Sequence, residues 1–274
     1  MPTLSFQDVD LRYIQDGQGP DIVWIPGGDE VADAWDNQFA TFRGAFRNTS
    51  FDPRGAGQTV CRKRPPWTIA VMAADCAALV KARCNPPVIM IGLSMGSLIT
   101  LQFAVNYPEL VRLAIPMGTS AKATGFSHDW MVAEVNFRSA GGQLPSDFAV
   151  THYAAFSYPS EVLGNDELWT KIRARVGGNY GHRDGDMLVA QWQACIDFDV
   201  VDQLPHCQVP IEVIGFSEDC QCPAPQGRRV AQLAPNARFH MLQGLGHVSC
   251  EVHKPEVVNN KIREILTSHG MLRT

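Results

Sequence analysis

The chain has 274 residues, a formal net charge of -5, a sequence pI near 5.9 and 45% hydrophobic residues. This length can bury a full core, and it fits one α/β domain with an inserted subdomain better than two independent domains. The acidic balance, without any basic stripe, gives no electrostatic reason to expect a nucleic-acid partner or an anionic membrane. The N-terminus carries no cationic start before an apolar segment, and no apolar run reaches membrane-spanning length, so we expect a cytoplasmic protein.

The cysteines indicate neither a disulfide framework nor a metal site. The eight cysteines stand at irregular spacings, and without an export signal we expect reduced thiols that pack as small apolar residues. Cys220 and Cys222 form the one closely spaced pair. A structural zinc site needs a second pair of Cys or His nearby, and none follows, so we expect no metal.

The first segments predict an edge hairpin followed by a buried strand. Residues 4–9 and 11–15 alternate imperfectly between apolar and polar side chains, which predicts an antiparallel hairpin at a sheet edge. Residues 21–25 are typical of a central strand, which stops at residues 26–28, Pro-Gly-Gly. A glycine pair at a strand end can leave backbone N–H groups facing something other than their own chain.

A second strand with a glycine-rich loop comes next. Residues 34–46 predict a helix with an aromatic buried side, and residues 48–51 predict the strand that follows it. Asp52 stands at the end of this strand, where we expect it to brace the loop. Thr68 then opens a strongly apolar helix over residues 69–82.

The segment 88–97 is the most specific in the chain. Four apolar residues after two prolines predict a strand buried on both faces, and residues 98–106 have helical spacing. Ser94 therefore lies on a strand-to-helix turn between Gly92 and Gly96, in the pattern G-x-S-x-G. The glycines leave no Cβ where strand and helix crowd together, which permits the strained backbone of a nucleophile elbow.

The alternation of strand and helix stops after a strand at residues 111–117. Residues 120–204 have a helical pattern with scattered aromatic and Met side chains, which predicts an inserted helical cap subdomain. Residues 1–119 and 205–274 then form the core domain.

The alternation resumes in the last part of the chain. Residues 211–215 and 238–242 predict strands, and residues 226–233 and 255–268 predict helices. Such an order indicates an α/β fold, with a mostly parallel central sheet and helices on both faces. Ligands bind beyond the carboxyl ends of the strands in these sheets.

Two groups that can activate Ser94 follow the last strands. A serine hydroxyl is a poor nucleophile near neutral pH and needs a base with a pKa near 7, which means a histidine. Among eight histidines, His247 follows the final strand on a glycine-rich loop, whereas His240 lies inside that strand. Asp219 follows the preceding strand on the same side and can orient the imidazole; its neighbour Glu218 is the alternative, and only one of the two can serve.

The order Ser94, Asp219, His247 is that of an α/β-hydrolase triad. The sequence resembles the capped esterases, lactonases and carbon–carbon hydrolases of the α/β-hydrolase fold superfamily, over nearly its whole length apart from the cap. This resemblance implies the α/β-hydrolase fold and these three residues as the catalytic triad. The motifs that carry it are residues 26–28, 52–57 and 92–96, Asp219, and Gly246-His247.

The resemblance also implies an oxyanion hole formed by the backbone N–H groups of Gly28 and Met95. The chain departs from many relatives at Pro26, where they carry a histidine before the glycine. Because the donors belong to the backbone, this departure does not remove the hole. No cofactor is implied.

The expected activity is hydrolysis of a small to medium, largely apolar carboxylic ester or lactone through an acyl-enzyme on Ser94. Serine in the elbow argues against haloalkane dehalogenases and epoxide hydrolases, which carry aspartate there. One alternative is a carbon–carbon hydrolase of a vinylogous diketone, which would need a cation such as Arg183 or Arg138 for the substrate carboxylate. Another is a hydrolase-fold ligand sensor with little turnover. In each case the partner is a small molecule, not a nucleic acid or a membrane.

Overall fold

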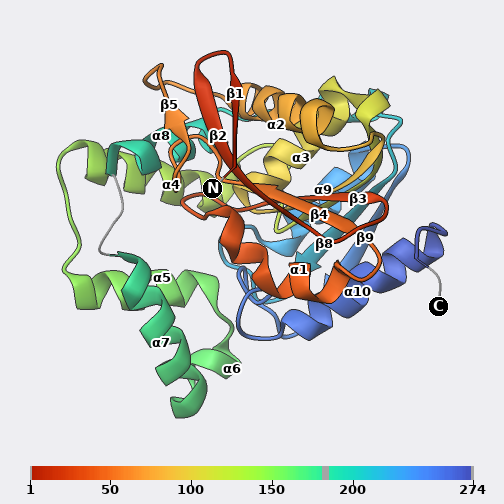
Figure 1. Ribbon diagram of the computed structural model, residues 1–274. Helices are drawn as coiled ribbons and strands as arrows, with labels where there is room; N and C mark the ends of the chain where they lie inside the picture. The colour runs from red at the N-terminus through yellow and green to blue at the C-terminus, as the bar shows by residue number, and fades with distance from the viewer. Residues whose placement is uncertain (1, 181–184, 273–274) are drawn as a thin grey trace.

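The structure is a computed structural model that describes residues 2–180 and 185–272. The described residues form a nine-stranded sheet with helices on both faces and a separate group of cap helices (Figure 1). The order of elements and the mostly parallel sheet are those predicted for an α/β-hydrolase fold.

The strands follow the order β1-β2-β4-β3-β6-β7-β8-β9, and β5 pairs with β2 outside this path. β2 is antiparallel to β1, β4 and β5, whereas the other pairs are parallel, so the predicted edge hairpin is confirmed. The short strand β5 was not predicted, because two residues carry no periodicity. The strands are β1 (Thr3–Phe6), β2 (Val9–Asp16), β3 (Asp21–Ile25), β4 (Arg47–Phe51), β5 (Val60–Cys61), β6 (Val88–Leu93), β7 (Val111–Met117), β8 (Ile211–Phe216) and β9 (Ala237–Leu242).

The register of the parallel strands brings their carboxyl ends to one edge of the sheet. Ile25 at the end of β3 pairs with Gly92 in β6, and Leu93 pairs with Met117 at the end of β7. The last residues of β8 and β9 also pair with each other. The segments after β3, β6, β8 and β9 therefore emerge side by side, which is where the candidate site lies.

Helices α2, α3 and α9 cover one face of the sheet, and α1 and α10 cover the other (Figure 1). The helix predicted over residues 34–46 is shorter: a 3₁₀ turn leads into α1, which ends before Gly44, a poor helix former. The elbow helix begins earlier than predicted, directly after Ser94. The helical segments of the core are η1 (Ala32–Trp35), α1 (Asp36–Phe42), α2 (Ile69–Arg83), α3 (Met95–Asn106), η2 (Pro108–Leu110), η3 (Leu204–His206), α9 (Ala224–Leu233) and α10 (Pro255–Ser268).

Helices α4 to α8, between β7 and β8, lie apart from the helices that cover the sheet, and we refer to this group as the cap. The chain enters and leaves it at adjacent points, where Lys122 and Asp199 form a β-bridge and an ion pair of 3.0 Å. Within the cap, α4 packs on α8, and α5 packs on α7. All of these helices lie inside the segment for which the sequence predicts a cap. They are α4 (Gly125–Ser139), α5 (Ser146–Ser157), α6 (Ser160–Leu163), α7 (Asp166–Tyr180) and α8 (Gly185–Ile196).

No helix in the described ranges is long and apolar enough to cross a membrane. All eight cysteines fall within the described ranges, and each is a free thiol.

Candidate active site

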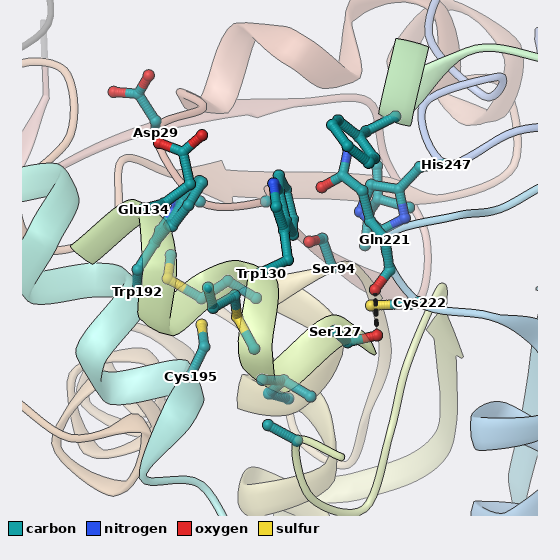
Figure 2. Close-up of a pocket in the computed structure, with 18 of the residues that line it drawn as sticks. Asp29, Ser94, Ser127, Trp130, Glu134, Trp192, Cys195, Gln221, Cys222 and His247 are labelled. Carbon is teal, nitrogen blue, oxygen red and sulfur yellow. Dashed lines mark hydrogen bonds between the residues drawn. The ribbon is translucent and has the colours of Figure 1, made fainter. Parts of the chain in front are cut away.

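Ser94 occupies the tight turn between β6 and α3. Its backbone has φ 55° and ψ −124°, a left-handed conformation that costs a non-glycine residue about 1–3 kcal/mol. The turn requires glycine on both sides. A Cβ on Gly92 would lie 2.1 Å from the Gly96 carbonyl oxygen, and a Cβ on Gly96 would lie 2.1 Å from the Ile25 oxygen. The sequence therefore folds into an elbow that presents Ser94 to a pocket between sheet and cap (Figure 2).

His247 and Asp219 meet at the same edge of the sheet. His247 Nδ1 lies 2.7 Å from Asp219 Oδ2, and both side chains are buried. The other Asp219 oxygen accepts hydrogen bonds from the Gln221 and Cys222 N–H groups, at 2.9 and 2.8 Å. Because the carboxylate can only accept, Nδ1 is the ring nitrogen that carries hydrogen. Nε2 is buried without a hydrogen-bond partner among the described residues, and the ring lines the same pocket as Ser94.

Burial and Asp219 act on the His247 ring in opposite directions. Burial lowers the pKa of His247, but the charge of Asp219 and its hydrogen bond raise it, and the net pKa lies above the ordinary value of 6.5. An imidazole of this kind accepts a proton more strongly than a free histidine does.

Gly118 gives the His247–Asp219 pair its space. It directly follows β7 with φ +52°, and a Cβ there would lie 3.1 Å from His247 Cε1 and 3.2 Å from Asp219 Oδ2. The close approach of the His247–Asp219 pair leaves little room for a side chain at this position.

Gly28 and Met95, the two expected oxyanion donors, also line the pocket. Met95 is the first residue of α3, so its N–H group has no acceptor within the helix. The Gly28 N–H donates to no acceptor within residues 2–180 and 185–272, whereas the N–H groups of both its neighbours are used. Both of these backbone donors therefore lie in the lining of the pocket that contains Ser94.

Two side chains hold residues 26–30, the loop that carries Gly28 and that we call the oxyanion loop. The Gly27 N–H donates to Glu30 Oε2 at 2.8 Å, and the Asp29 N–H donates to Gln191 Oε1 at 2.7 Å. Gln191 comes from cap helix α8 and donates in turn to the Arg54 carbonyl oxygen at 2.7 Å. Neither Glu30 nor Gln191 was predicted from the sequence. Each contact depends on the tertiary fold, and no local pattern marks it.

The competitors named from the sequence have other partners. Glu218 points to the cap, where its carboxylate accepts from the Ser160 N–H at 2.9 Å and from its hydroxyl at 2.8 Å. Asp219 is therefore the acid that reaches the imidazole. His240 hydrogen bonds Glu212 at 2.7 Å inside the sheet.

Asp52 braces its loop as predicted. One of its oxygens accepts from the Ala32 N–H at 2.9 Å and from the Arg12 guanidinium at 3.0 Å. The other accepts from the Gln58 N–H at 2.8 Å. All of its contacts are structural, and Asp52 is not among the residues that line the pocket.

Aromatic side chains of the cap form one wall of the pocket (Figure 2). The Trp130 ring lies 5.1 Å from the Phe156 ring on one side and 5.1 Å from the Trp192 ring on the other. A Cβ on Gly28 would lie 3.7 Å from Trp192 Nε1, so this wall reaches the oxyanion loop. The pocket encloses about 1100 Å³ including its open mouth.

A polar cluster lies on the same cap wall. Glu134 is buried and accepts from Arg138 Nε at 3.1 Å, and its other oxygen lies 2.8 Å from His152 Nε2. Arg138 thus lines the pocket as the sequence alternative required. Arg183, the other arginine considered for a substrate carboxylate, lies outside the described residues. Within those residues, no group of three or more His, Cys, Asp or Glu side chains is arranged to hold a metal ion.

Residues 22–261 match the model of the Alpha/beta hydrolase family. The chain belongs to this family. One relative is a Mycobacterium tuberculosis protein provisionally named non-heme bromoperoxidase BpoC, 27% identical over 95% of this chain and 98% of its own length. Another is 3-oxoadipate enol-lactonase 2 of Acinetobacter baylyi, 24% identical over 96% of each chain.

Solved structures of other hydrolases share the fold. The enol-lactonase of Burkholderia xenovorans superposes with a TM-score of 0.84 at 22% identity, covering 97% of this chain and 100% of its own. A thermophilic esterase from Thermogutta terrifontis superposes with a TM-score of 0.81 at 20% identity, covering 95% and 94%. At these identities the likeness is one of fold.

Proposed function

We propose that this hydrolase-family protein cleaves a small to medium, largely apolar carboxylic ester or lactone, with Ser94, His247 and Asp219 as its catalytic triad. The observation that carries the proposal is that the strained Ser94 turn lines one pocket with the His247 ring, which bonds Asp219 on its other side. An L-residue keeps a left-handed backbone only where the surrounding fold enforces it, and such strain gathers at functional sites.

The reaction follows from the atoms in this pocket. Ser94 Oγ attacks the substrate carbonyl carbon while His247 Nε2 takes the hydroxyl proton. The tetrahedral oxyanion accepts hydrogen bonds from the Gly28 and Met95 N–H groups, and each such donor contributes about 3 kcal/mol to catalysis. The C–O bond then breaks as His247 returns the proton to the leaving alkoxide, which leaves an acyl-enzyme.

Water completes the cycle. His247 Nε2 takes a proton from a water molecule while the water oxygen attacks the acyl carbon. The bond between the acyl carbon and Ser94 Oγ then breaks as His247 returns the proton to Oγ, and the carboxylic acid product leaves. Throughout, Asp219 keeps the ring orientation and stabilises the imidazolium.

The pocket wall supports an uncharged substrate with apolar groups. The Trp130, Trp192 and Phe156 rings supply apolar surface, and the Arg138 charge is matched by Glu134 within the wall. The names of the enol-lactonase and esterase relatives favour the same reaction class.

The test compares hydrolysis of p-nitrophenyl butyrate by wild type, Ser94→Ala and Ser127→Ala. Ser127 is the matched control, because it also lines the pocket but donates its hydroxyl to the Gln221 carbonyl oxygen. We expect a burst followed by turnover in wild type and Ser127→Ala, with one adduct after treatment with a serine-directed phosphonate. Turnover or adduct formation that survives in Ser94→Ala rejects the proposal.

Carbon–carbon hydrolysis is the second candidate, and the position of Arg138 on the pocket wall favours it. Arg138 Nε bonds Glu134, and the N–H groups at the other end of the guanidinium would bind the carboxylate of a vinylogous diketone acid. The test measures consumption of such an acid and hydrolysis of the butyrate ester by wild type and Arg138→Gln. A variant that loses consumption of the acid but keeps ester hydrolysis would favour this candidate over simple ester hydrolysis.

A further inference from the structure

One buried residue of the cap contacts both of the loops that carry Asp219 and His247. Ser157 is the last residue of helix α5 and is fully buried. The helix ends there because Pro159 follows, and Tyr158 before the proline has an extended backbone. The carbonyl groups in the last turn of a helix have no N–H partner within the helix. The Ser157 carbonyl oxygen is therefore available to a donor from another segment.

The Ser157 carbonyl group holds the loop of His247. Its oxygen accepts from the N–H group of Val248, the residue directly after His247, at 3.2 Å. On the other side of His247, a Cβ on Gly246 would lie 2.8 Å from the same oxygen and 2.9 Å from the Pro159 nitrogen. Both of these are backbone atoms, so a side chain at position 246 would push this loop away from the cap. The residues on both sides of His247 thus contact one carbonyl group.

The Ser157 hydroxyl group holds the loop of Asp219. It accepts from Gln221 Nε2 at 2.9 Å, and the backbone N–H of the same glutamine donates to Asp219 Oδ1 at 2.9 Å. The other carboxylate oxygen, Oδ2, is left for His247 Nδ1 at 2.7 Å. Gln221 therefore connects the Ser157 hydroxyl group to the carboxylate that orients the imidazole.

Further hydrogen bonds fix the two loops at the same junction. Glu218, directly before Asp219, accepts from the N–H and hydroxyl groups of Ser160, at 2.9 and 2.8 Å. The Glu218 N–H donates to the Leu245 carbonyl oxygen at 2.9 Å, which joins the two loops to each other. Water competes for the exposed Ser160 contact, whereas Ser157 is fully buried, so Ser157 provides the firmer attachment.

We propose that Ser157 is a positioning residue, which holds Asp219 and His247 in the geometry of their hydrogen bond. Ser157 is not among the residues that line the pocket, so it acts through this pair and not on the substrate. Docking of the cap at the end of α5 thereby completes the triad. The inference rests on the proposed function, because the effect of Ser157 on rate is an effect on ester turnover.

The first test measures kcat and KM for p-nitrophenyl butyrate in Ser157→Ala. This change removes the hydroxyl group and keeps the carbonyl group, so it releases the loop of Asp219 alone. We expect kcat to fall about 10- to 100-fold with KM nearly unchanged, because a displacement of about 1 Å at the reacting groups can cost about 10²-fold in rate.

Thr151→Ala is the matched control on the same helix. Among the described residues, the exposed Thr151 hydroxyl bonds only the carbonyl groups of Asp147 and Phe148, which belong to α5 itself. We therefore expect wild-type kinetics in Thr151→Ala. A kcat in Ser157→Ala equal to that of the control overturns the proposal.

A double-variant cycle tests whether Ser157 acts through Gln221. Gln221→Leu removes the donor of the same hydrogen bond, and kcat is compared because Gln221 also lines the pocket and can change KM. If the two residues act as one unit, the double variant lowers kcat no further than the more severe single variant. Losses that multiply in the double variant overturn this link.

The second test needs no activity. The proton on His247 Nδ1 lies in a short hydrogen bond to a carboxylate, and such a proton gives a ¹H NMR resonance far downfield of the amide signals. Its absence in His247→Gln assigns it. We expect this resonance to move upfield, or to broaden by exchange with water, in Ser157→Ala and in Gln221→Leu, and to stay in place in Thr151→Ala.

The two tests separate the two proposals. A downfield resonance that is unchanged in both Ser157→Ala and Gln221→Leu overturns the positioning role, whether or not the protein turns over esters. Absence of ester turnover in wild type rejects the proposed function, and the resonance then decides by itself whether Ser157 holds the pair. If Ser157→Ala does not fold, Gln221→Leu, which changes a partly exposed side chain, decides the outcome of both tests.

Discussion

The turn that carries Ser94 leaves no space for a side chain at Gly96. A Cβ there would stand 2.1 Å from the Ile25 carbonyl oxygen and 2.6 Å from that of Pro26, both backbone atoms that cannot move aside. Overpacking against flexible side chains costs about 1–3 kcal/mol, so we expect Gly96→Ala to lose at least about 3 kcal/mol of unfolding free energy. Urea denaturation measures it.

Gly28→Ala is the matched control for this change. It stands in the oxyanion loop, but a Cβ there would meet its nearest neighbours at an ordinary 3.7 Å, and its φ is not in the left-handed region. We expect a change within about 0.5 kcal/mol. Equal losses in the two variants would contradict the assignment of the elbow as the crowded point.

We expect the protonation of His247 to set the pH dependence of turnover. The ring must be neutral to take the Ser94 proton. Burial lowers its pKa, but the charge and hydrogen bond of Asp219 and the charge of Glu30 together outweigh burial, so the pKa lies above 6.5. We therefore expect kcat/KM for p-nitrophenyl butyrate to rise with pH and to reach half its maximum above pH 6.5.

Asp219→Asn separates the two effects on this ring. The Asp219 charge no longer opposes burial, so the midpoint moves below that of wild type, and the rate falls about 10⁴-fold because the ring loses its orientation. A midpoint that stays in place would show that another group controls the profile.

At the scale of elements, Gln191 ties cap helix α8 to the oxyanion loop. Its side chain is fully buried and bonds one backbone group in each of two core loops. Gln191→Leu removes both of these buried hydrogen bonds, which costs about 1–3 kcal/mol, and the loosened loop lowers kcat about 10- to 100-fold with less effect on KM.

Gln193→Leu is the control on the same helix. Among the described residues, the Gln193 side chain bonds only Asp197, at 2.9 Å and at an exposed site, so both stability and kcat should stay near wild type. Thermal melts and butyrate kinetics measure the two effects, and a kcat in Gln191→Leu equal to that of Gln193→Leu would contradict this link.

The sequence could predict those elements whose residue pattern lies within one short segment of the chain. Strand β6 is a continuous apolar run because both of its faces are buried, and the glycines around Ser94 mark the turn that follows it. The helix over residues 34–46 was predicted too long, because apolar spacing does not distinguish a 3₁₀ turn from an α-helix.

For the molecule as a whole, the limit of sequence reasoning is the pairing of distant residues. Ser94, Asp219 and His247 could be proposed together because each follows a strand of one parallel sheet, so topology supplies their proximity. Gln191 in the cap and Asp29 after Gly28 follow no such rule. Their hydrogen bond depends on how helix α8 packs over the loop that carries Gly28, which no spacing in the chain records.

A buried charge cluster connects three separate parts of the whole fold. The Arg54 guanidinium is 1% exposed and donates to Asp75 on α2 and to Asp8 in the β1–β2 turn, at distances of 2.5–3.0 Å. Arg54→Met leaves Asp75 buried without its cation, which costs about 3–5 kcal/mol of unfolding free energy at neutral pH.

The loss in Arg54→Met should depend on pH in a defined direction. Burial already raises the pKa of Asp75 against the effect of Arg54, and without the cation it rises further, so the folded variant takes up a proton that the unfolded chain lacks. Its stability is then retained at low pH and lost as pH rises above the ordinary aspartate range. In Arg54→Met with Asp75→Leu no buried carboxylate is left on α2, and we expect much of the loss to be recovered at neutral pH. Urea unfolding at acidic and neutral pH measures both effects, and a double variant less stable than the single one would show that Asp75 serves the fold by something other than its pairing with Arg54.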